Sequence, residues 1–432
     1  MTLQNAPQQR VFLFLQGPSS PIFAKTADRL EAKGHPCLRI NLNPGDQIFW
    51  RRKGGYNYRG RAGNDWRTYV ASFMDRHAVT DLVLLGEERP YHLTAIDAAK
   101  DRDITVSVVE MGYLRPDWLT LERNGMSSNS HFPNDPQQIV EAAHTLPEPD
   151  WTRRYSQSFT VEAAYDLLYN LPNVFLWFLF PHYRRHALFH PLAEYAGWII
   201  RLTSGRKRAV AATMLVENML AGDISFFVFP LQLQTDFQLR AHSPYNDQRE
   251  AITEVITSFA AHAPRASQLV VKVHPLDNGL IDWRAYAGEL ATRLGVGGRV
   301  QFLDGGDLNA LLAKTAGVVT INSTVGLHAL QLGTPVKVLG TAVFDIAKLS
   351  DQQELDQFWA APTIPQEPVQ SAFFRLLAAA IQVRGNFYSA TGTDAGAEAI
   401  AERLHARSIN QPGAFIDPPP RKKPHKRGSR SH

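Results

Sequence analysis

The sequence has almost no cysteine, and this bounds the compartment in which the protein works. Cys37 is the only cysteine among 432 residues, so no disulfide can form within the chain. A chain without disulfides suits a reducing compartment. The first apolar run, residues 11–15, is too short for the core of a signal peptide. We therefore expect a cytoplasmic protein.

Long hydrophobic runs are also missing. The most apolar later stretch, residues 174–180, is stopped by Pro181 and followed by Arg184 and Arg185. A helix needs roughly 20 apolar residues to span a bilayer. We expect the protein to be at most peripheral on the inner membrane.

Several familiar catalytic motifs are absent as well. The chain contains no Walker A sequence, no CxxC pair and no HExxH. No Asp-x-Asp pair of the kind that holds a metal ion with a nucleotide diphosphate stands at a predicted strand end. Helix N-termini, Lys and His would then meet the charge of a leaving group. We therefore expect no metal site and no cofactor.

Positive charge is concentrated at one end of the chain. The formal net charge is +4, and residues 421–430 contain six Lys or Arg and no acid. The rest of the chain is thus close to neutral, and we do not expect it to bind nucleic acid. The segment 418–432 opens with three prolines, and this composition predicts a disordered basic tail. Six cations would suit a tether to an anionic membrane.

Length and periodicity predict an α/β protein with two doubly wound, Rossmann-like domains. A chain of 432 residues exceeds one compact core. Short apolar runs alternate twice with helical patterns, which favours parallel βαβ units. Two such domains facing a cleft form the GT-B architecture, although other two-domain α/β enzymes share this pattern. The predicted strands are 11–15, 36–41, 82–85 and 105–109 in the first series, and 225–229, 269–273, 300–303, 318–321 and 336–339 in the second.

The expected organisation has five parts. These are an N-terminal acceptor-side domain (1–145), a helical aromatic connection (146–215), a C-terminal nucleotide-donor domain (216–390), a helix (391–417) and the basic tail (418–432). The connection carries many aromatic residues, and Arg184 and Arg185 lie among them. Two interpretations stay open for it: a helical segment that packs over both domains, or a surface that lies on the membrane.

Ligands of doubly wound sheets bind beyond the carboxyl ends of the strands, and polar residues cluster at four such ends. Asn322, Ser323 and Thr324 follow one predicted strand and open a helix, where hydroxyl and N–H groups suit a phosphate. A simple helix cap is the competing interpretation. Lys272, His274 and Pro275 follow another strand and suit a phosphate or a ribose.

The other two clusters supply carboxylates. Gln232 and Asp236 follow the strand 225–229, where Asp236 would serve as nucleophile, base or electrostatic stabiliser. An Asp that only caps a nearby helix is the competing interpretation. The fourth cluster and a loop after the first strand give the remaining candidates for substrate contact, which are Glu110, Tyr113, Arg115, Gln16 and Gly17. A surface ion pair would equally explain Glu110 with Arg115.

Taken in order, these segments resemble the KpsS/LipB-like family of capsule polysaccharide biosynthesis and export proteins. The resemblance rests on residues 12–18, 110–122, 230–238, 274–277 and 322–330, and spans roughly residues 10–390. His328 stands where related enzymes often have Glu, so no carboxylate role carries over there. The stretch before His274 also lacks a His that many relatives have.

The resemblance implies a retaining β-Kdo transferase that uses CMP-Kdo as donor. It implies a lysophosphatidylglycerol or related lipid acceptor at the inner membrane surface, and contacts with other capsule biosynthesis proteins. Asp236 would be the nucleophile and Glu110 the second catalytic carboxylate. His274, Pro275, Ser323 and Thr324 would bind CMP. Lys272, Arg115 and Gln232 are candidates for the Kdo carboxylate.

Two other readings of the same residues stay open. Another nucleotide-dependent enzyme, such as a CDP-glycerol phosphotransferase or a sugar-nucleotide epimerase, would use the same His-Pro and Ser-Thr clusters. A non-catalytic assembly or export factor would need none of the carboxylates.

Overall fold

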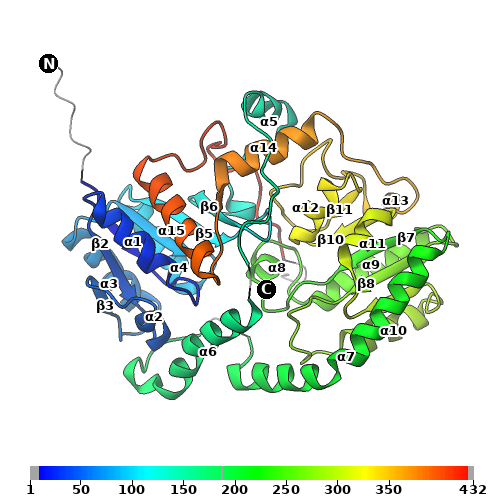
Figure 1. Cartoon of the computed structure of the whole chain (residues 1–432), viewed down its shortest axis with the longest axis horizontal. Helices are drawn as coiled ribbons and strands as arrows, with labels where there is room; N and C mark the ends of the chain where they lie inside the picture. The colour runs from blue at the N-terminus through cyan, green and yellow to red at the C-terminus, as the bar shows by residue number, and fades with distance from the viewer. Residues whose placement is uncertain (1–8, 157, 186–187, 427–432) are drawn as a thin grey trace, which may run out of the picture. The chain divides into compact units, whose positions relative to one another are not determined.

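The computed structural model describes residues 9–156, 158–185 and 188–426. The chain forms two compact units, and each takes segments from distant parts of the sequence (Figure 1). Unit 1 comprises Met1–Phe132, Thr145–His186 and Phe374–Pro418, and unit 2 comprises Pro133–His144, Ala187–Phe373 and Pro419–His432. Each unit is a doubly wound α/β structure around a largely parallel sheet.

The sheet of unit 1 has seven strands in the order β12-β6-β5-β4-β1-β2-β3. Five of them are parallel and run in the Rossmann order, with β1 at the centre between β4 and β2. The two others extend the sheet beyond β5: β6 is antiparallel to β5, and β12 is antiparallel to β6. The strands are β1 (Phe12–Phe14), β2 (Cys37–Asn41), β3 (Gly55–Asn57), β4 (Asp81–Leu85), β5 (Thr105–Met111), β6 (Trp118–Arg123) and β12 (Gln382–Arg384).

Helices cover both faces of this sheet, because the central strands are apolar on both sides. Phe12 and Phe14 point to a core with α1 and α15, whereas Leu13 points to a core with α3 and α4. The helices of unit 1 are α1 (Ile22–Ala32), α2 (Pro44–Ile48), α3 (Asn64–Arg76), α4 (Pro90–Lys100), α6 (Phe159–Phe175) and α15 (Ala390–His405), with 3-10 turns η1 (Ser127–Asn129) and η2 (Trp177–Leu179); α14 (Val369–Ile381) begins in unit 2 and ends in unit 1.

The last helix corrects the expected division of the chain. We expected residues 216–390 to form one domain followed by a separate helix, but α15 packs along α1 and β12 joins the sheet of unit 1. Ion pairs line the α1–α15 contact, including Lys25 with Asp394 at 2.7 Å and Arg29 with Glu398 at 2.6 Å. The sequence could not show this return, because periodicity reveals an element and not its partner.

Unit 2 contains a five-stranded parallel sheet in the order β11-β10-β7-β8-β9, with β7 at the centre. All five strands match those predicted for the second series, and every strand end agrees within one residue. The strands are β7 (Phe226–Pro230), β8 (Gln268–Lys272), β9 (Val300–Leu303), β10 (Gly317–Thr320) and β11 (Val336–Val338). The helices are α5 (Pro136–Ala143), α7 (Pro191–Ala221), α8 (Phe237–Ala241), α9 (Gln248–His262), α10 (Trp283–Arg293), α11 (Leu308–Lys314), α12 (Thr324–Gln331) and α13 (Leu355–Phe358).

The basic tail is the second correction. Residues 427–432 lie outside the described residues, but Pro418 belongs to unit 1 and residues 419–426 belong to unit 2, so this part is not a free tail. Arg421 is buried, and its guanidinium donates to the carbonyl oxygens of Val343 at 2.7 Å, Pro133 at 3.1 Å and Ala342 at 3.2 Å. The Arg421 guanidinium thus supplies the hydrogen bonds that water would otherwise give to three carbonyl oxygens. Composition alone does not reveal these contacts.

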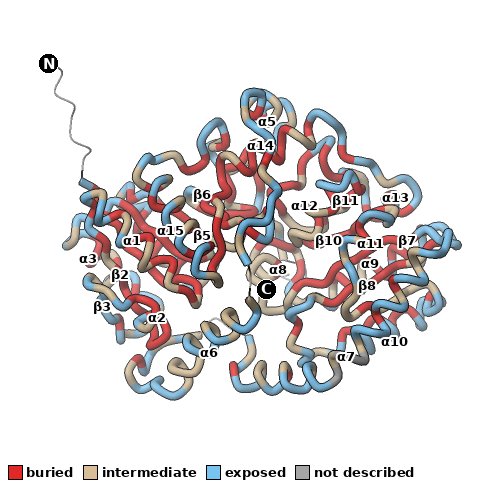
Figure 2. Tube along the Cα trace, viewed as in Figure 1, coloured by how far each residue is buried: buried red, intermediate tan, exposed pale blue. Residues whose placement is uncertain are grey.

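The expected helical connection, residues 146–215, is helical but belongs to both units. It contributes α6 to unit 1 and most of α7 to unit 2. Both helices are largely exposed or half-buried, in contrast with the buried strands (Figure 2). Within the described residues, we find no helix with the length and apolar character that a membrane crossing requires.

Candidate active site

The strand order of unit 2 places a ligand-binding edge between β7 and β10. The chain leaves β7 toward β8 on one side, and β10 returns on the other side, so the two strands flank a topological switch point. Loops at the carboxyl ends of β10, β7 and β8 carry three of the four predicted clusters. Neighbouring strands lie ~4.8 Å apart, so these three loops open within about 10 Å of each other.

Gln232 and Asn322 join the two loops across this switch point. The Gln232 amide donates to the Asn322 Oδ1 at 2.9 Å, and the Asn322 backbone N–H donates to Gln232 Oε1 at 3.3 Å. Asn322 also donates to the carbonyls of Gln238 at 2.8 Å and His242 at 3.3 Å. Both amides are buried. These hydrogen bonds join the loops that follow β7 and β10, and they hold α8 against these loops.

Asp236 is the N-cap of α8, the helix that Asn322 contacts through the Gln238 carbonyl. Its carboxylate accepts the backbone N–H of Gln238 at 2.8 Å, and the side chain is half-buried. Arg240, one turn further along, interacts electrostatically with it. The capping role that competed with catalysis in the sequence is therefore real. It also fixes the carboxylate in one orientation at the carboxyl edge of the sheet.

Ser323 and Thr324 begin α12 at the same edge. The Ser323 hydroxyl accepts the Val325 N–H at 3.2 Å, and its backbone N–H donates to Thr320 Oγ1 at 3.1 Å. Both residues are half-buried. The first N–H groups of a helix have no partner within it and carry a partial positive charge. The start of α12 thus combines a cap with the chemistry that suits a phosphate.

The third loop, after β8, divides into a buried and an exposed part. Lys272 is buried, its ammonium donates to the Gly305 carbonyl at 2.5 Å, and burial lowers its pKa. His274 is half-buried and Pro275 exposed. The His274 Nδ1 accepts the Leu276 N–H at 3.0 Å, which orients the ring and leaves Nε2 as the nitrogen that carries hydrogen in the neutral form. His274 is therefore better placed than Lys272 to meet a ligand.

The other predicted residues belong to unit 1, where the switch point lies between β1 and β4. Gln16 follows β1 there, and its backbone carbonyl accepts the Leu85 N–H at 3.2 Å. The buried Gln16 amide donates to the hydroxyls of Tyr169 at 2.5 Å and Tyr183 at 3.2 Å. A Cβ on Gly17 would stand 2.8 Å from the Phe23 ring, so glycine there serves packing.

Glu110 lies near the end of β5, and Tyr113 and Arg115 follow this strand, but the three residues have different environments. Glu110 is half-buried at the end of β5, and its Oε1 accepts the Met111 N–H at 3.0 Å. The Tyr113 hydroxyl donates to Glu122 at 3.3 Å, and burial raises its pKa well above the ordinary value. Arg115 is exposed. Tyr113 and Glu110 are thus both half-buried, and the Tyr113 hydroxyl contacts the buried carboxylate of Glu122, whereas Arg115 lies at the surface.

Sequence reasoning missed a buried polar network beside Gln16. Arg39 and Asp46 form a buried pair at 3.0 Å, and the Tyr169 hydroxyl reaches the same carboxylate at 3.3 Å. Charged residues are almost never this buried unless they are paired. Another carboxyl, Glu87, follows β4, and burial raises its pKa to about 7. The sequence signal for Glu87 is its position just beyond the end of the apolar strand β4, with Gly86 between them.

Known proteins are similar in sequence to this chain over most of its length. The family model described as "Capsule polysaccharide biosynthesis protein" matches residues 80–388. The chain is 32% identical over 380 residues to the capsule polysaccharide export protein KpsS of Escherichia coli, which covers 87% of this chain and 96% of KpsS. It is 30% identical over 388 residues to the capsule polysaccharide modification protein LipB of Neisseria meningitidis serogroup A, with 87% and 91% covered.

Among solved structures, the β-Kdo 2,7 transferase of Thermosulfurimonas dismutans KpsC aligns with a TM-score of 0.45 and 13% identity, over 92% of this chain and 99% of that one. The sequence matches alone are sufficient to decide the family. The chain belongs to the capsule polysaccharide biosynthesis protein family.

Proposed function

We propose that the protein is a retaining β-Kdo glycosyltransferase that moves Kdo from CMP-Kdo to a lysophosphatidylglycerol or related lipid acceptor. The observation that carries this proposal is the bridge of Gln232 and Asn322 across the switch point of unit 2. It brings a fixed carboxylate, Asp236, to the same sheet edge as a phosphate-suited helix start at Ser323. A donor that joins a phosphate to an anomeric carbon needs both groups.

In the proposed reaction the Asp236 carboxylate attacks the anomeric carbon of Kdo, and CMP departs with the bonding electron pair. The acceptor hydroxyl then attacks the glycosyl–Asp236 ester, loses its proton to a base and releases the carboxylate. Two inversions at one carbon give net retention. Ser323, Thr324 and His274 would bind the phosphate of CMP, and Pro275 would restrict the loop. Glu110 in unit 1 is proposed as the second carboxylate.

The relatives named above supply the biological setting. KpsS is described as an export protein and LipB as a modification protein for capsule polysaccharide, and KpsC as a Kdo transferase. We propose by analogy that this protein works in the cytoplasm, on the inner membrane surface, alongside other capsule biosynthesis proteins. We also propose that transfer needs neither a metal nor a cofactor, so an excess of EDTA should leave the rate unchanged.

The test is incubation of the purified full chain with CMP-Kdo and lysophosphatidylglycerol, followed by mass analysis of the lipid. We expect the addition of one Kdo. The decisive variant is Asp236→Asn, because Asn caps a helix about as well as Asp does but cannot act as the carboxylate. Transfer should be lost in Asp236→Asn while the melting temperature is unchanged. Full activity in this variant would leave Asp236 with a capping role only and refute the mechanism.

Each open alternative predicts a different experimental result. Turnover of CDP-glycerol would indicate a phosphotransferase, and conversion of a sugar nucleotide without acceptor would indicate an epimerase. Restoration of capsule by Asp236→Asn and Glu110→Gln proteins in a deletion strain would indicate a non-catalytic factor.

A further inference from the structure

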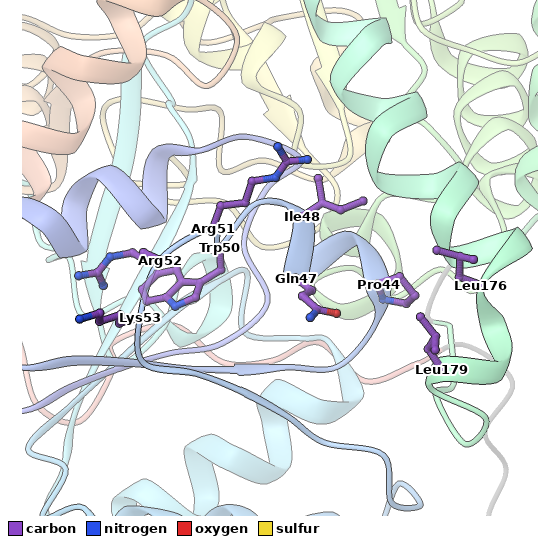
Figure 3. Close-up of a pocket in the computed structure, with 9 residues that line it drawn as sticks. All are labelled: Pro44, Gln47, Ile48, Trp50, Arg51, Arg52, Lys53, Leu176 and Leu179. Carbon is purple, nitrogen blue, oxygen red and sulfur yellow. The ribbon is translucent and has the colours of Figure 1, made fainter.

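A pocket of about 670 Å³ lies in unit 1, and none of the predicted site residues lines it (Figure 3). It is built by α2, by the segment that follows it, and by the end of α6 with η2. The residues that line it are Pro44, Gln47, Ile48, Trp50, Arg51, Arg52, Lys53, Leu176 and Leu179. None of these residues is acidic.

The pocket has an apolar end and a basic end. Leu176, Leu179 and Pro44 lie together at one end, whereas Arg52 and Lys53 lie at the other, beyond Trp50 (Figure 3).

The three cations of the pocket differ in their partners. Arg52 is paired with Asp28 at 2.8 Å and Glu31 at 2.5 Å. Arg51 and Lys53 are exposed, and the described part of the chain offers them neither a hydrogen bond nor an ion pair. The excess positive charge of the pocket therefore rests on Arg51 and Lys53.

The apolar end continues into a run of exposed aromatic residues. Phe175, Trp177 and Phe178 are 64%, 63% and 58% exposed, and Leu176 between them is 38% exposed. Single exposed apolar residues are ordinary, but four in succession form a patch that water does not favour. Aromatic side chains beside basic ones are typical of segments that lie in the headgroup region of a bilayer.

The aromatic run is held on a rigid support. The Gly45 N–H donates to the Asn173 side chain at 2.8 Å, and the Asn43 amide donates to the Tyr169 hydroxyl at 3.0 Å. A Cβ on Gly45 would stand 2.6 Å from the Tyr169 carbonyl oxygen, so α2 and α6 approach each other as closely as backbone allows. The run is therefore presented in a fixed place beside Arg51 and Lys53, as a docking surface requires.

We propose that this surface docks unit 1 on an anionic phospholipid bilayer. Arg51 and Lys53 bind lipid phosphate groups, and Trp177 and Phe178 enter the headgroup region beside them. Charge complementarity favours an anionic bilayer as the partner of this surface. Arg51 and Lys53 match the lipid phosphate groups, and the exposed aromatic residues beside them match the apolar phase beneath those groups. The inference rests on the proposed function, since a lipid acceptor lies in such a bilayer, and it names the contact residues for it.

The test is flotation of the purified full chain with vesicles of phosphatidylcholine alone or with phosphatidylglycerol added. We expect binding to the mixed vesicles, weakened by salt, and little binding to phosphatidylcholine. The double variant Arg51→Glu with Lys53→Glu should bind mixed vesicles at least about tenfold less. The control Arg265→Glu with Arg293→Glu makes the same charge change at exposed sites of unit 2 and should bind as wild type.

The apolar part needs its own variant. Trp177→Ser with Phe178→Ser should also lose vesicle binding, whereas Ile364→Ser, at a residue of equal exposure in unit 2, should not. Equal binding by the wild type and both double variants would overturn the proposal, as would absence of wild-type binding to mixed vesicles. If the Arg265→Glu, Arg293→Glu control also lost vesicle binding, net charge alone would explain the effect, and this result would equally refute the site.

These outcomes are separable from failure of the proposed function. Asp236→Asn should lose transfer but keep vesicle binding. The Arg51→Glu, Lys53→Glu variant should keep its transfer rate on an acceptor dispersed in detergent, where no bilayer is needed. Vesicle binding without any transfer by the wild type would refute the enzyme assignment and leave the docking site standing.

Discussion

Replacement of Asn322 by Ala should weaken unit 2 and disorder the proposed nucleophile at once. The Asn322 side chain makes hydrogen bonds to Gln232 at 2.9 Å and to the carbonyls of Gln238 at 2.8 Å, His242 at 3.3 Å and Thr341 at 3.4 Å. Alanine would leave several of these buried groups unsatisfied. Since each unsatisfied buried group costs about 1–3 kcal/mol, and the weaker contacts cost less, we expect a loss of about 2–4 kcal/mol.

The assay is thermal unfolding followed by circular dichroism, with the transition of unit 2 compared among variants. A loss of this size should lower its midpoint by roughly 5–15 °C for a domain of about 200 residues. Asn309→Ala, at an exposed position of the same unit, should change stability by less than about 0.5 kcal/mol. If Asn322→Ala unfolds at the same temperature as the Asn309→Ala control, the hydrogen bonds between Gln232 and Asn322 do not stabilise unit 2 and the reasoning is wrong.

Three further predictions concern unit 1. Burial raises the pKa of Glu87 to about 7 from 4.5, so the folded state holds the proton more tightly, and stability should fall by about 3 kcal/mol as pH rises between these values; melting curves of Glu87→Gln should lack this slope. Arg10 is paired with Asp81, both buried, so Arg10→Met should cost about 3–5 kcal/mol by leaving a buried carboxylate unpaired, and urea unfolding with an unchanged midpoint would contradict this. Gly45→Ala would place a methyl group 2.6 Å from the Tyr169 carbonyl and should cost about 1–3 kcal/mol in the same measurement while reducing vesicle binding.

Strands and helices were predictable where apolar runs are buried on both faces. The parallel strands β7 to β11 appear where the sequence predicts them, because each combines a short apolar run with a flanking turn. The antiparallel strands β6 and β12 were not predicted. The strand Gln382–Arg384 has only three residues and no alternation of apolar and polar residues. Its partner Trp118–Arg123 is distant in sequence, so no local pattern predicts the pairing.

The candidate site was predictable in position more than in detail. Topology alone brings the loops with Gln232, His274 and Ser323 to one edge, because the carboxyl ends of parallel strands meet there. The engagement of Gln232 by Asn322 was not predictable, since a buried amide and a catalytic amide look identical in sequence. Arg421 shows the same limit, because its proline-rich, basic surroundings concealed the three carbonyls it contacts.

The central claim, a nucleotide phosphate at the carboxyl edge of unit 2, is tested most directly by binding of CMP to Ser323→Asp protein. Asp preserves the cap of α12 but adds a negative charge where the phosphate would lie. Isothermal titration should show CMP binding to the wild type and a loss of at least about tenfold in Ser323→Asp, with cytidine affected much less. Equal CMP affinity in the two proteins would contradict the account.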